Sequence, residues 1–253
     1  MSAHTPSPLP ERHAIVRVRH EIVRRKLVVG AVEQLTPRMR RVRFASPELA
    51  GFVSTSPDDH VKVFFPTRDG APAMRDFTPR AFDAATNELT LDFALHGGGV
   101  ASAWAEAAKV GDTLEIGGPR GSLVVTDDFD WYLFVGDESA LPAIGRFLET
   151  LREGVPVATI VALASDDEAQ TPPTRTSWTP RWIARGEPSE RDAEALRDAC
   201  RAFTPPAGDG FVWIAGEDAI VRTVRTHFVD ERGHDTAWMK GSAYWHRARA
   251  DAH

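Results

Sequence analysis

The residues best suited to chemistry lie in two short segments about twenty residues apart. Arg75, Phe77 and Thr78 place a cation, a flat apolar ring and a hydroxyl within four residues, and a glycine run, His96-Gly97-Gly98-Gly99, opens an expected helix. Arginine pairs bidentately with phosphate, and free amides at a helix start attract the same group. The two segments together predict a flavin site, with a diphosphate held between them.

Each part of the expected site also has a plainer explanation. The segment around Phe77 could be an ordinary strand with one core ring and surface arginines, and the glycine run could be a flexible turn before a helix. In the flavin interpretation, Thr78 bonds to the ring edge near the reactive N5, and Pro79 biases Thr78 towards an extended conformation. The diphosphate would then meet the free amides of Val100, Ala101 and Ser102.

The elements that must position these residues change in kind along the chain. Residues 28–35, 40–44, 60–65, 75–82, 88–95, 113–116 and 122–125 are predicted strands, rich in β-branched and aromatic residues and separated by turn residues. One helix is expected over residues 100–109. Many short strands with a single helix predict an antiparallel Greek-key β-barrel over residues 26–127.

From residue 128 onward, buried strands alternate with helices. Strands are expected at 131–135, 157–163, 181–184, 211–215 and 236–240, and helices at 139–151, 189–203 and 218–229. This alternation predicts a parallel sheet with helices on both faces over residues 128–253. Ligands favour the cleft between two such domains and the carboxyl ends of parallel strands.

The second domain lacks the Gly-x-Gly-x-x-Gly fingerprint of dinucleotide folds. Its first strand runs instead into Gly136-Asp137-Glu138-Ser139-Ala140, whose acids would repel a phosphate, so this turn is expected to face nicotinamide or ribose. Asp166, after the second strand, is placed to bond a ribose 2′-hydroxyl. These acids favour NADH, although Arg175 and Arg185 lie nearby, and all of them could be solvated loop charge.

Composition limits the remaining classes. The net charge of −6 argues against nucleic acid as the main partner, no apolar run is long enough for a membrane span, and one cysteine, Cys200, excludes an internal disulfide. The histidines are scattered, so no metal site is expected. Residues 1–25 are expected to form a flexible tail without a secretory signal, and the protein to be a cytoplasmic monomer.

The chain resembles the siderophore-interacting protein family, FAD-dependent ferric-siderophore reductases of the ferredoxin-reductase-like superfamily. The resemblance spans about residues 25 to 247. It is carried, in order, by Arg75-Asp76-Phe77-Thr78-Pro79-Arg80, Asp92-Phe93-Ala94-Leu95-His96-Gly97, Ala101-Ser102-Ala103-Trp104, Gly118-Pro119-Arg120-Gly121-Ser122, Gly136-Asp137-Glu138-Ser139-Ala140-Leu141-Pro142-Ala143-Ile144, Trp213-Ile214-Ala215-Gly216-Glu217 and Tyr244-Trp245.

The resemblance implies that NAD(P)H passes hydride to FAD, which then reduces a bound ferric siderophore by single electrons and so releases ferrous iron. Thr78 is the implied catalytic residue, and Lys62, Arg120 and Arg247 are candidates for binding the anionic siderophore. The implied cofactor contacts are Arg75, Asp76, Phe77, Thr78, Arg80, Asp92, His96, Gly98, Gly99, Val100, Ala101, Ser102, Gly136, Asp137, Glu138, Ser139, Ala140, Asp166, Gly216, Glu217, Tyr244 and Trp245.

The chain departs from the family pattern at two places. Phe77 stands where the family usually has tyrosine, which keeps the ring and loses a hydroxyl, and the segment after Trp245 is altered. Three alternatives therefore stay open: a general flavin or quinone reductase or biosynthetic flavoenzyme on the same fold, a flavin-bearing siderophore binder without turnover, and a non-catalytic scaffold.

Overall fold

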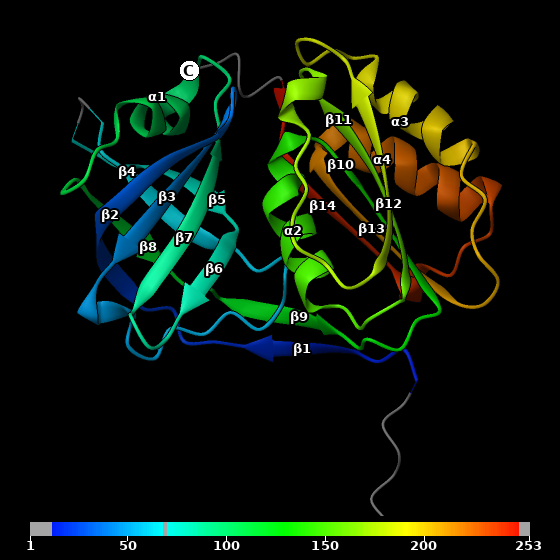
Figure 1. Ribbon diagram of the computed structural model, residues 1–253, viewed down its shortest axis with the longest axis horizontal. Helices are drawn as coiled ribbons and strands as arrows, with labels where there is room; N and C mark the ends of the chain where they lie inside the picture. Colours follow the sequence, from blue (N-terminus) through cyan, green and yellow to red (C-terminus); the bar gives the residue numbers. More distant parts are fainter. Residues whose placement is uncertain (1–11, 68–69, 248–253) are drawn as a thin grey trace, which may run out of the picture.

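The computed structural model describes residues 12–67 and 70–247. They form an antiparallel sheet and a parallel sheet, with a two-stranded ribbon running beneath both (Figure 1). The predicted fold class, an antiparallel barrel followed by a parallel-sheet α/β domain, is confirmed, the barrel being a curled, incompletely closed sheet.

The antiparallel sheet has seven strands in the order β5-β4-β8-β2-β3-β7-β6. Its core is built from alternate side chains along each strand. In β4, for example, Val61, Val63 and Phe65 are buried, whereas Lys62 is exposed. Helix α1 (Gly99–Ala107) packs on this core through Ala105. The strands are β2 (Arg24–Thr36), β3 (Met39–Ala45), β4 (Val61–Phe65), β5 (Ala73–Phe77), β6 (Pro79–Asp83), β7 (Glu88–Ala94) and β8 (Thr113–Gly117).

The chain connectivity requires this sheet to curl. Strands β5 and β6 occupy opposite edges, yet only Thr78 separates Phe77, the last residue of β5, from Pro79, the first of β6. Seven flat strands would hold the two edges about 29 Å apart, whereas one intervening residue spans about 7 Å. The sheet therefore curls until its two edges approach each other at Thr78, although β5 and β6 do not pair, and the single strand predicted over residues 75–82 is two strands in the structure.

The parallel sheet has the order β12-β11-β10-β13-β14. Along β10, Tyr132 and Phe134 pack under α2, whereas Leu133 and Val135 pack under α3 and α4, which explains the continuous apolar run. The elements are β10 (Trp131–Gly136), α2 (Leu141–Thr150), β11 (Pro156–Leu163), β12 (Ser177–Ala184), α3 (Asp192–Arg201), β13 (Gly210–Glu217), α4 (Asp218–Thr226) and β14 (Met239–Trp245).

Short helical turns complete the chain. They are the 3-10 turns η1 (Pro47–Leu49), η2 (Glu138–Ala140), η3 (Asp166–Glu168) and η5 (Thr236–Trp238), and a π-helical turn, η4 (His227–Glu231), that continues α4. Because η5 precedes it, β14 begins three residues later than the predicted strand at 236–240 and extends to Trp245.

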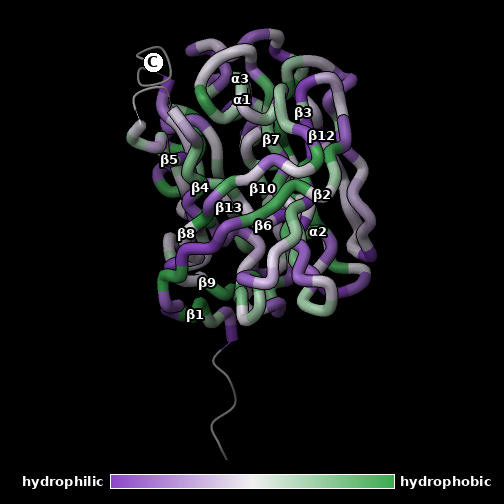
Figure 2. The backbone as a smooth tube through the Cα atoms, turned by 90° about the vertical axis from the view of Figure 1, so that its left-hand side faces the viewer, coloured by the Kyte–Doolittle hydropathy of each residue, from purple (hydrophilic) through white to green (hydrophobic). Residues whose placement is uncertain are grey.

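The expected tail over residues 1–25 contains ordered structure. Strand β1 (Ile15–Arg19) pairs antiparallel with β9 (Gly121–Val125), and Figure 2 shows the two side by side at the base of the molecule. The His13 ring stacks on Phe129 at 4.1 Å, with its two nitrogens 3.1 and 3.0 Å from Asp128 and Asp209. Long-range contacts thus hold residues 12–25, and residues 1–11 lie outside the described part.

Two further sequence features can now be placed. Cys200 is buried, and burial raises the pKa of its thiol to about 12, so it is not a nucleophile. Within residues 12–67 and 70–247, no helix is both long and apolar enough to cross a bilayer.

Candidate functional site

The glycine run and α1 form an open helix start. Gly97 and Gly99 have φ values of +72° and +75°, a region that favours glycine. Gly98 caps α1 without a side-chain hydrogen bond, and the first turn holds no acid. The His96 ring lies over the turn, since a Cβ on Gly99 would lie 3.5 Å from its Cε1. The amides of this helix start therefore remain free for an anion.

The residues of β5 divide between the two faces of the sheet. Opposite residues share a face, and the register pairs Phe77 with Val61 and Arg75 with Val63, whose side chains are in the core. Arg75 and Phe77 therefore lie on the side of the sheet that α1 covers. Arg75 stays exposed because β5 is an edge strand, and among residues 12–67 and 70–247 its guanidinium bonds only to its neighbour, the Met74 carbonyl, at 2.9 Å.

Asp76 lies on the other face. Its carboxylate pairs with Lys62 at 2.8 Å, and the two side chains are 49% and 45% exposed. Asp76 and the proposed substrate residue Lys62 thus neutralise each other in this structure, away from the face that carries Arg75.

An aromatic cluster links Phe77 to α1. The Phe77 ring centroid lies 4.6 Å from that of Phe93, and Phe93 lies 5.6 Å from Trp104 of α1. Phe65 contacts all three rings. The cluster thus links Phe77, at the end of β5, to the middle of α1 through Phe93 and Phe65.

Thr78 stands where the two edges of the sheet meet and is buried. Beside it lies the hydroxyl of Tyr244 on β14, so that this point joins the barrel to the last strand of the parallel sheet. Burial raises the pKa of Tyr244, and nearby Asp58 adds to the shift, while Thr78 opposes it. The two hydroxyls do not meet the geometry of a hydrogen bond, and the buried Tyr244 oxygen has no partner among the described residues.

Arg80 and Asp92 are occupied by partners within the chain. Arg80 forms a two-bond ion pair with Glu149 of α2, and Asp92 receives bonds of 2.7 and 2.8 Å from Arg41. Both were expected to contact cofactor. In this structure Arg80 joins the barrel to α2 and Asp92 holds β3 against β7. Their contact with FAD stays a prediction.

Asp137 organises the carboxyl edge of the parallel sheet. Its Oδ1 accepts from the amide and hydroxyl of Ser139, and its Oδ2 accepts from the Glu217 amide and the Trp245 indole. A Cβ on Gly216 would meet Asp137 Oδ2 at 2.6 Å, so that position requires glycine. Asp137 was expected to face a ligand directly, but its oxygens fasten the ends of β10, β13 and β14.

The other acids of this edge differ in availability. Glu217 caps α4 by accepting from the Ala219 amide at 2.7 Å. Glu138 pairs with Arg185 at 2.5 Å, and burial raises the pKa of Glu138 against the lowering effect of Arg185. Asp166, after β11, is exposed and so remains accessible to a ribose. Gly136 and Ala140 line the same turn and are buried.

The three candidate siderophore residues are only partly brought together. Lys62 pairs across β4 and β8 with Gly117, three residues before the exposed Arg120. Arg247 lies at the parallel-sheet edge, where it donates to the Ser189 carbonyl at 2.7 Å. Lys62 and Arg120 therefore share one end of the barrel, and Arg247 belongs to the other domain.

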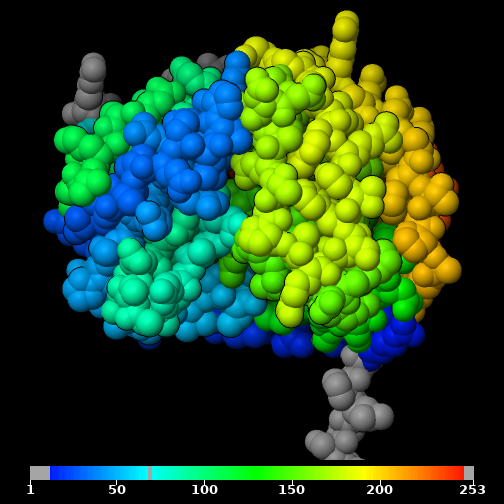
Figure 3. Space-filling model, viewed as in Figure 1, coloured from blue at the N-terminus to red at the C-terminus, as the bar shows by residue number. Residues whose placement is uncertain are grey.

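Sequence reasoning missed the buried residues that join the domains. Asp58 accepts a hydrogen bond from the Trp213 indole at 2.9 Å and forms an ion pair with Lys240 at 2.5 Å, and its side chain is 3% exposed. Arg146 of α2 donates to Ser54, and burial lowers the pKa of Arg146. The domains thus meet along a bonded seam (Figure 3). No local signal marks these residues, because each partner lies about 90 to 180 residues away.

Glu168 is another such residue. Its carboxylate accepts from the Thr36 hydroxyl at 2.5 Å and the Arg38 amide at 2.9 Å, both at the β2–β3 turn. The sequence groups Glu168 with the exposed acids after β11, but the structure buries it against the barrel.

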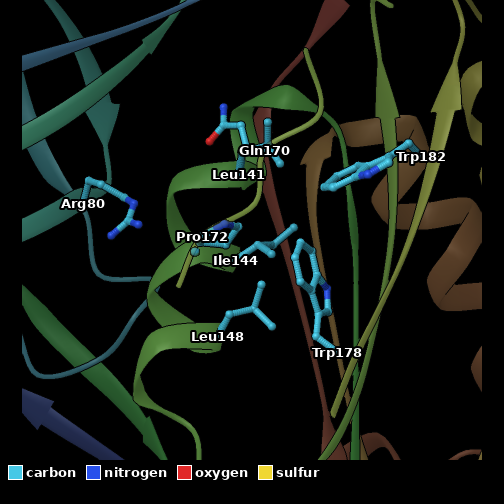
Figure 4. A pocket seen from close by; sticks show the side chains of 9 residues that line it. Arg80, Leu141, Ile144, Leu148, Gln170, Pro172, Trp178 and Trp182 are labelled. Atoms are coloured by element: carbon cyan, nitrogen blue, oxygen red, sulfur yellow. The ribbon is translucent and has the colours of Figure 1, made fainter. Parts of the chain in front are cut away.

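A small cavity lies between α2 and β12 (Figure 4). It is lined by Arg80, Leu141, Ile144, Gly145, Leu148, Gln170, Pro172, Trp178 and Trp182, and about 10 Å³ of it admits a water-sized sphere. That volume holds about one water molecule. The cavity is too small for a cofactor and lies on the face of the parallel sheet that α2 covers.

The site fits a flavin dinucleotide by its own features. An exposed guanidinium and an uncapped helix start share one face of the barrel, and an unpartnered hydroxyl lies where the sheet edges meet. In the described ranges, no group of three or more histidine, cysteine or acidic side chains is arranged to hold a metal ion.

Comparison with known proteins supports the same assignment. Residues 28–73 and 66–123 match the siderophore-interacting FAD-binding domain, and residues 129–248 match the siderophore-interacting protein family. The NADPH-dependent ferric-chelate reductase of Escherichia coli K12 is 36% identical over 251 residues, covering 91% of this chain and 96% of the relative. The ferric vibriobactin reductase ViuB of Vibrio cholerae is 33% identical over 150 residues, 52% of this chain and 53% of ViuB.

Solved structures show the same fold over the whole domain pair. A siderophore utilization protein from T. fusca has a TM-score of 0.86 and 30% identity, covering 92% of this chain and 97% of that one. The siderophore-interacting protein SipS from Aeromonas hydrophila has a TM-score of 0.76 and 28% identity, covering 91% and 92%. The resemblance and the FAD prediction drawn from the sequence are both confirmed.

Proposed function

Because the chain belongs to the siderophore-interacting protein family, we propose that it is an FAD-dependent NAD(P)H:ferric-siderophore oxidoreductase. The observation that carries the proposal is that Arg75 and the uncapped start of α1 share one face of the barrel, next to the domain seam where Thr78 meets Tyr244. The names of the E. coli and V. cholerae relatives support ferric chelates as the substrate class.

Bound FAD supplies the redox chemistry: it accepts hydride from NAD(P)H and passes single electrons to the ferric siderophore, from which iron is released as Fe(II). The chain's own task is positioning. Arg75 and the amides of Val100 and Ala101 hold the diphosphate, because a charged fork and a helix dipole favour the same anion. The Ser102 amide makes the first intrahelical bond, to the Gly98 carbonyl, and so is not free for the anion.

Thr78 is the proposed catalytic residue. It is buried at the junction of the two sheet edges, and in this proposal its hydroxyl bonds to the reactive edge of the flavin. Tyr244 brings a second hydroxyl to the same point from the other domain, and this hydroxyl has no hydrogen-bond partner within residues 12–67 and 70–247. Bringing both hydroxyls to one point orients the ring for transfer.

Lys62, Arg120 and Arg247 are proposed to attract the anionic siderophore. The Lys62–Asp76 pair is exposed, so Lys62 exchanges its partner for a ligand at little cost. Of these three residues, only Arg247 lies in the segment after Trp245 that departs from the family pattern. A cytoplasmic location and a monomeric state stay predictions from the sequence.

The proposal is tested by anaerobic NADH or NADPH oxidation with several ferric chelates and a ferrous trap. Ferrous iron that forms only when FAD, a nicotinamide coenzyme and a ferric siderophore are all present supports the reductase. Tight chelate binding without ferrous iron would indicate a carrier. Reduction of quinones or free flavin in preference to every ferric chelate would indicate another enzyme on this fold.

A further inference from the structure

A β-bulge turns the side chain of Arg80 away from the barrel. The register of β6 against β7 passes from Pro79 directly to Ala81, so Arg80 is an extra residue in this ladder. Such a bulge interrupts the alternation of side chains along a strand and often re-aims one of them beside a functional site. Figure 4 shows the Arg80 side chain reaching from the barrel towards α2.

Helix α2 receives the Arg80 guanidinium at close range. Both terminal nitrogens donate to the carboxylate of Glu149, Nη1 at 2.8 Å, and the Arg80 side chain is 10% exposed. A Cβ on Gly145 would lie 3.1 Å from both Nε and Nη2 of Arg80. Glycine is unfavourable inside a helix, but here it lets the guanidinium approach the backbone of α2. A bidentate bond and a close approach thus fix one geometry between β6 and α2.

This contact joins the two places between which hydride is proposed to move. On the barrel side, Arg80 comes two residues after Thr78, where the edge of the flavin is expected. On the other side, α2 begins at Leu141, directly after the turn at residues 136–140 that is expected to face the coenzyme. Gly145 lies four residues, or about 6 Å, further along the helix. Arg80 therefore links the expected flavin edge to the expected coenzyme turn through few intervening residues.

We propose that Arg80 is a positioning residue for hydride transfer, and that its contact with Glu149 and Gly145 sets the distance between the flavin edge at Thr78 and the nicotinamide. The inference rests on the proposed function and adds the residue that aligns the two domains. This role requires no contact between Arg80 and FAD. Hydride transfer needs its reacting atoms about 3–3.5 Å apart, and a misplacement of about 1 Å costs about 100-fold in rate.

The two halves of the reaction respond differently to a loss of alignment. Hydride passes from carbon to nitrogen as a bond breaks and another forms, so small displacements slow it steeply. Single-electron transfer to the ferric siderophore needs no bond between donor and acceptor, so it is far less sensitive to them. A variant that only loosens the alignment therefore slows reduction of the flavin and leaves its reoxidation unchanged.

The test follows each half-reaction by anaerobic stopped flow on the FAD-loaded protein. With saturating NADPH or NADH, flavin reduction in Arg80→Gln is expected to be at least about tenfold slower than in wild type. Arg80→Lys keeps the charge without the fork and is expected to fall between. Reoxidation by a ferric siderophore, measured after the flavin has been titrated just to full reduction with dithionite, is expected to match wild type in both variants.

Further variants show whether Arg80 acts through α2. Glu149→Gln is expected to slow flavin reduction as well, and the double variant Arg80→Gln/Glu149→Gln to be no slower than Arg80→Gln alone, because both changes break one contact. The matched control is Arg38→Gln, which breaks an exposed ion pair with Glu187 between the same two domains. This control is expected to reduce its flavin at the wild-type rate.

Two measurements do not depend on turnover. FAD titrations of the apoprotein are expected to give the wild-type Kd for Arg80→Gln and Glu149→Gln. Amide hydrogen exchange of apo Arg80→Gln is expected to rise in β6 and α2 and to stay unchanged in β1 and β9.

Four results overturn the proposal: wild-type flavin reduction in a folded Arg80→Gln, equal slowing of both half-reactions, equal slowing in Arg38→Gln, or weaker FAD binding in Arg80→Gln with an unaffected Glu149→Gln. The last result would mean that Arg80 acts by touching the cofactor. A wild-type flavin that neither coenzyme reduces would instead contradict the proposed function itself.

Discussion

Arg75 gives the sharpest test of the flavin site. Its side chain is exposed and, in the part of the chain that the structure describes, bonds only to the adjacent Met74 carbonyl, so Arg75→Ala is expected to leave the fold intact. The loss falls instead on the cofactor, because the remaining guanidinium donors are free for a diphosphate. Losing such charged hydrogen bonds is expected to cost about 1.5–3 kcal/mol of FAD binding, or roughly a 10- to 150-fold higher Kd.

The assay is titration of apoprotein with FAD, followed by quenching of flavin fluorescence. The matched control is Arg43→Ala, an exposed arginine on β3 of the same sheet that lies on the outer face, between the buried residues Val42 and Phe44. The control is expected to bind FAD as the wild type does. If Arg75→Ala and Arg43→Ala bind FAD equally well, Arg75 does not hold the diphosphate.

Three other predictions concern the scaffold. Asp58→Ala removes the buried partner of Lys240 and is expected to lower the free energy of unfolding in urea by about 3–5 kcal/mol. Asp76→Ala breaks an exposed ion pair and is expected to cost at most about 1 kcal/mol. Equal losses in the two variants would refute a buried bond between the domains. Tyr244→Phe removes a buried hydroxyl that has no hydrogen-bond partner among the described residues, so the apoprotein should be as stable as wild type or more stable in the same urea experiment. A clear loss of stability would contradict this. Hydrogen bonds from Arg201 and, to a lesser extent, His227 lower the pKa of Glu231 from 4.5 to about 2. A carboxylate whose pKa is lowered by folding stabilises the protein above its unfolded pKa, so the loss of stability in Glu231→Gln should be full at pH 7 and shrink from pH 4.5 towards pH 2. A loss of stability in urea that does not change with pH would contradict this prediction.

Local patterns were enough to predict the two domains. The alternation in β4 and the continuous apolar run of β10 each reflect how many faces of a strand are covered, and that is written in neighbouring residues. The sequence was likewise enough to group Arg75 with the glycine run as one expected diphosphate site. The structure adds that both lie on one face, because the register places Arg75 opposite a core residue.

Contacts between distant segments were beyond this reasoning. Arg80 belongs to the same short motif as Arg75, but its side chain meets Glu149 of α2 and bonds there. Asp137 was taken for a ligand contact, although its oxygens bind three other parts of the same sheet edge. Strand β1 was missed because its partner β9 lies about a hundred residues later. A single sequence does not reveal which distant group neutralises a charge.

The central claim is that this chain carries electrons from a nicotinamide coenzyme through FAD to a ferric siderophore. Its most direct test is the flavin spectrum of the FAD-loaded protein under anaerobic conditions, recorded while NADPH or NADH and then a ferric siderophore are added. The account predicts that the oxidised flavin absorbance near 450 nm bleaches on addition of coenzyme and returns with the ferric siderophore, as a ferrous trap develops colour. A bleached flavin that stays reduced in the presence of every ferric siderophore tested would contradict it.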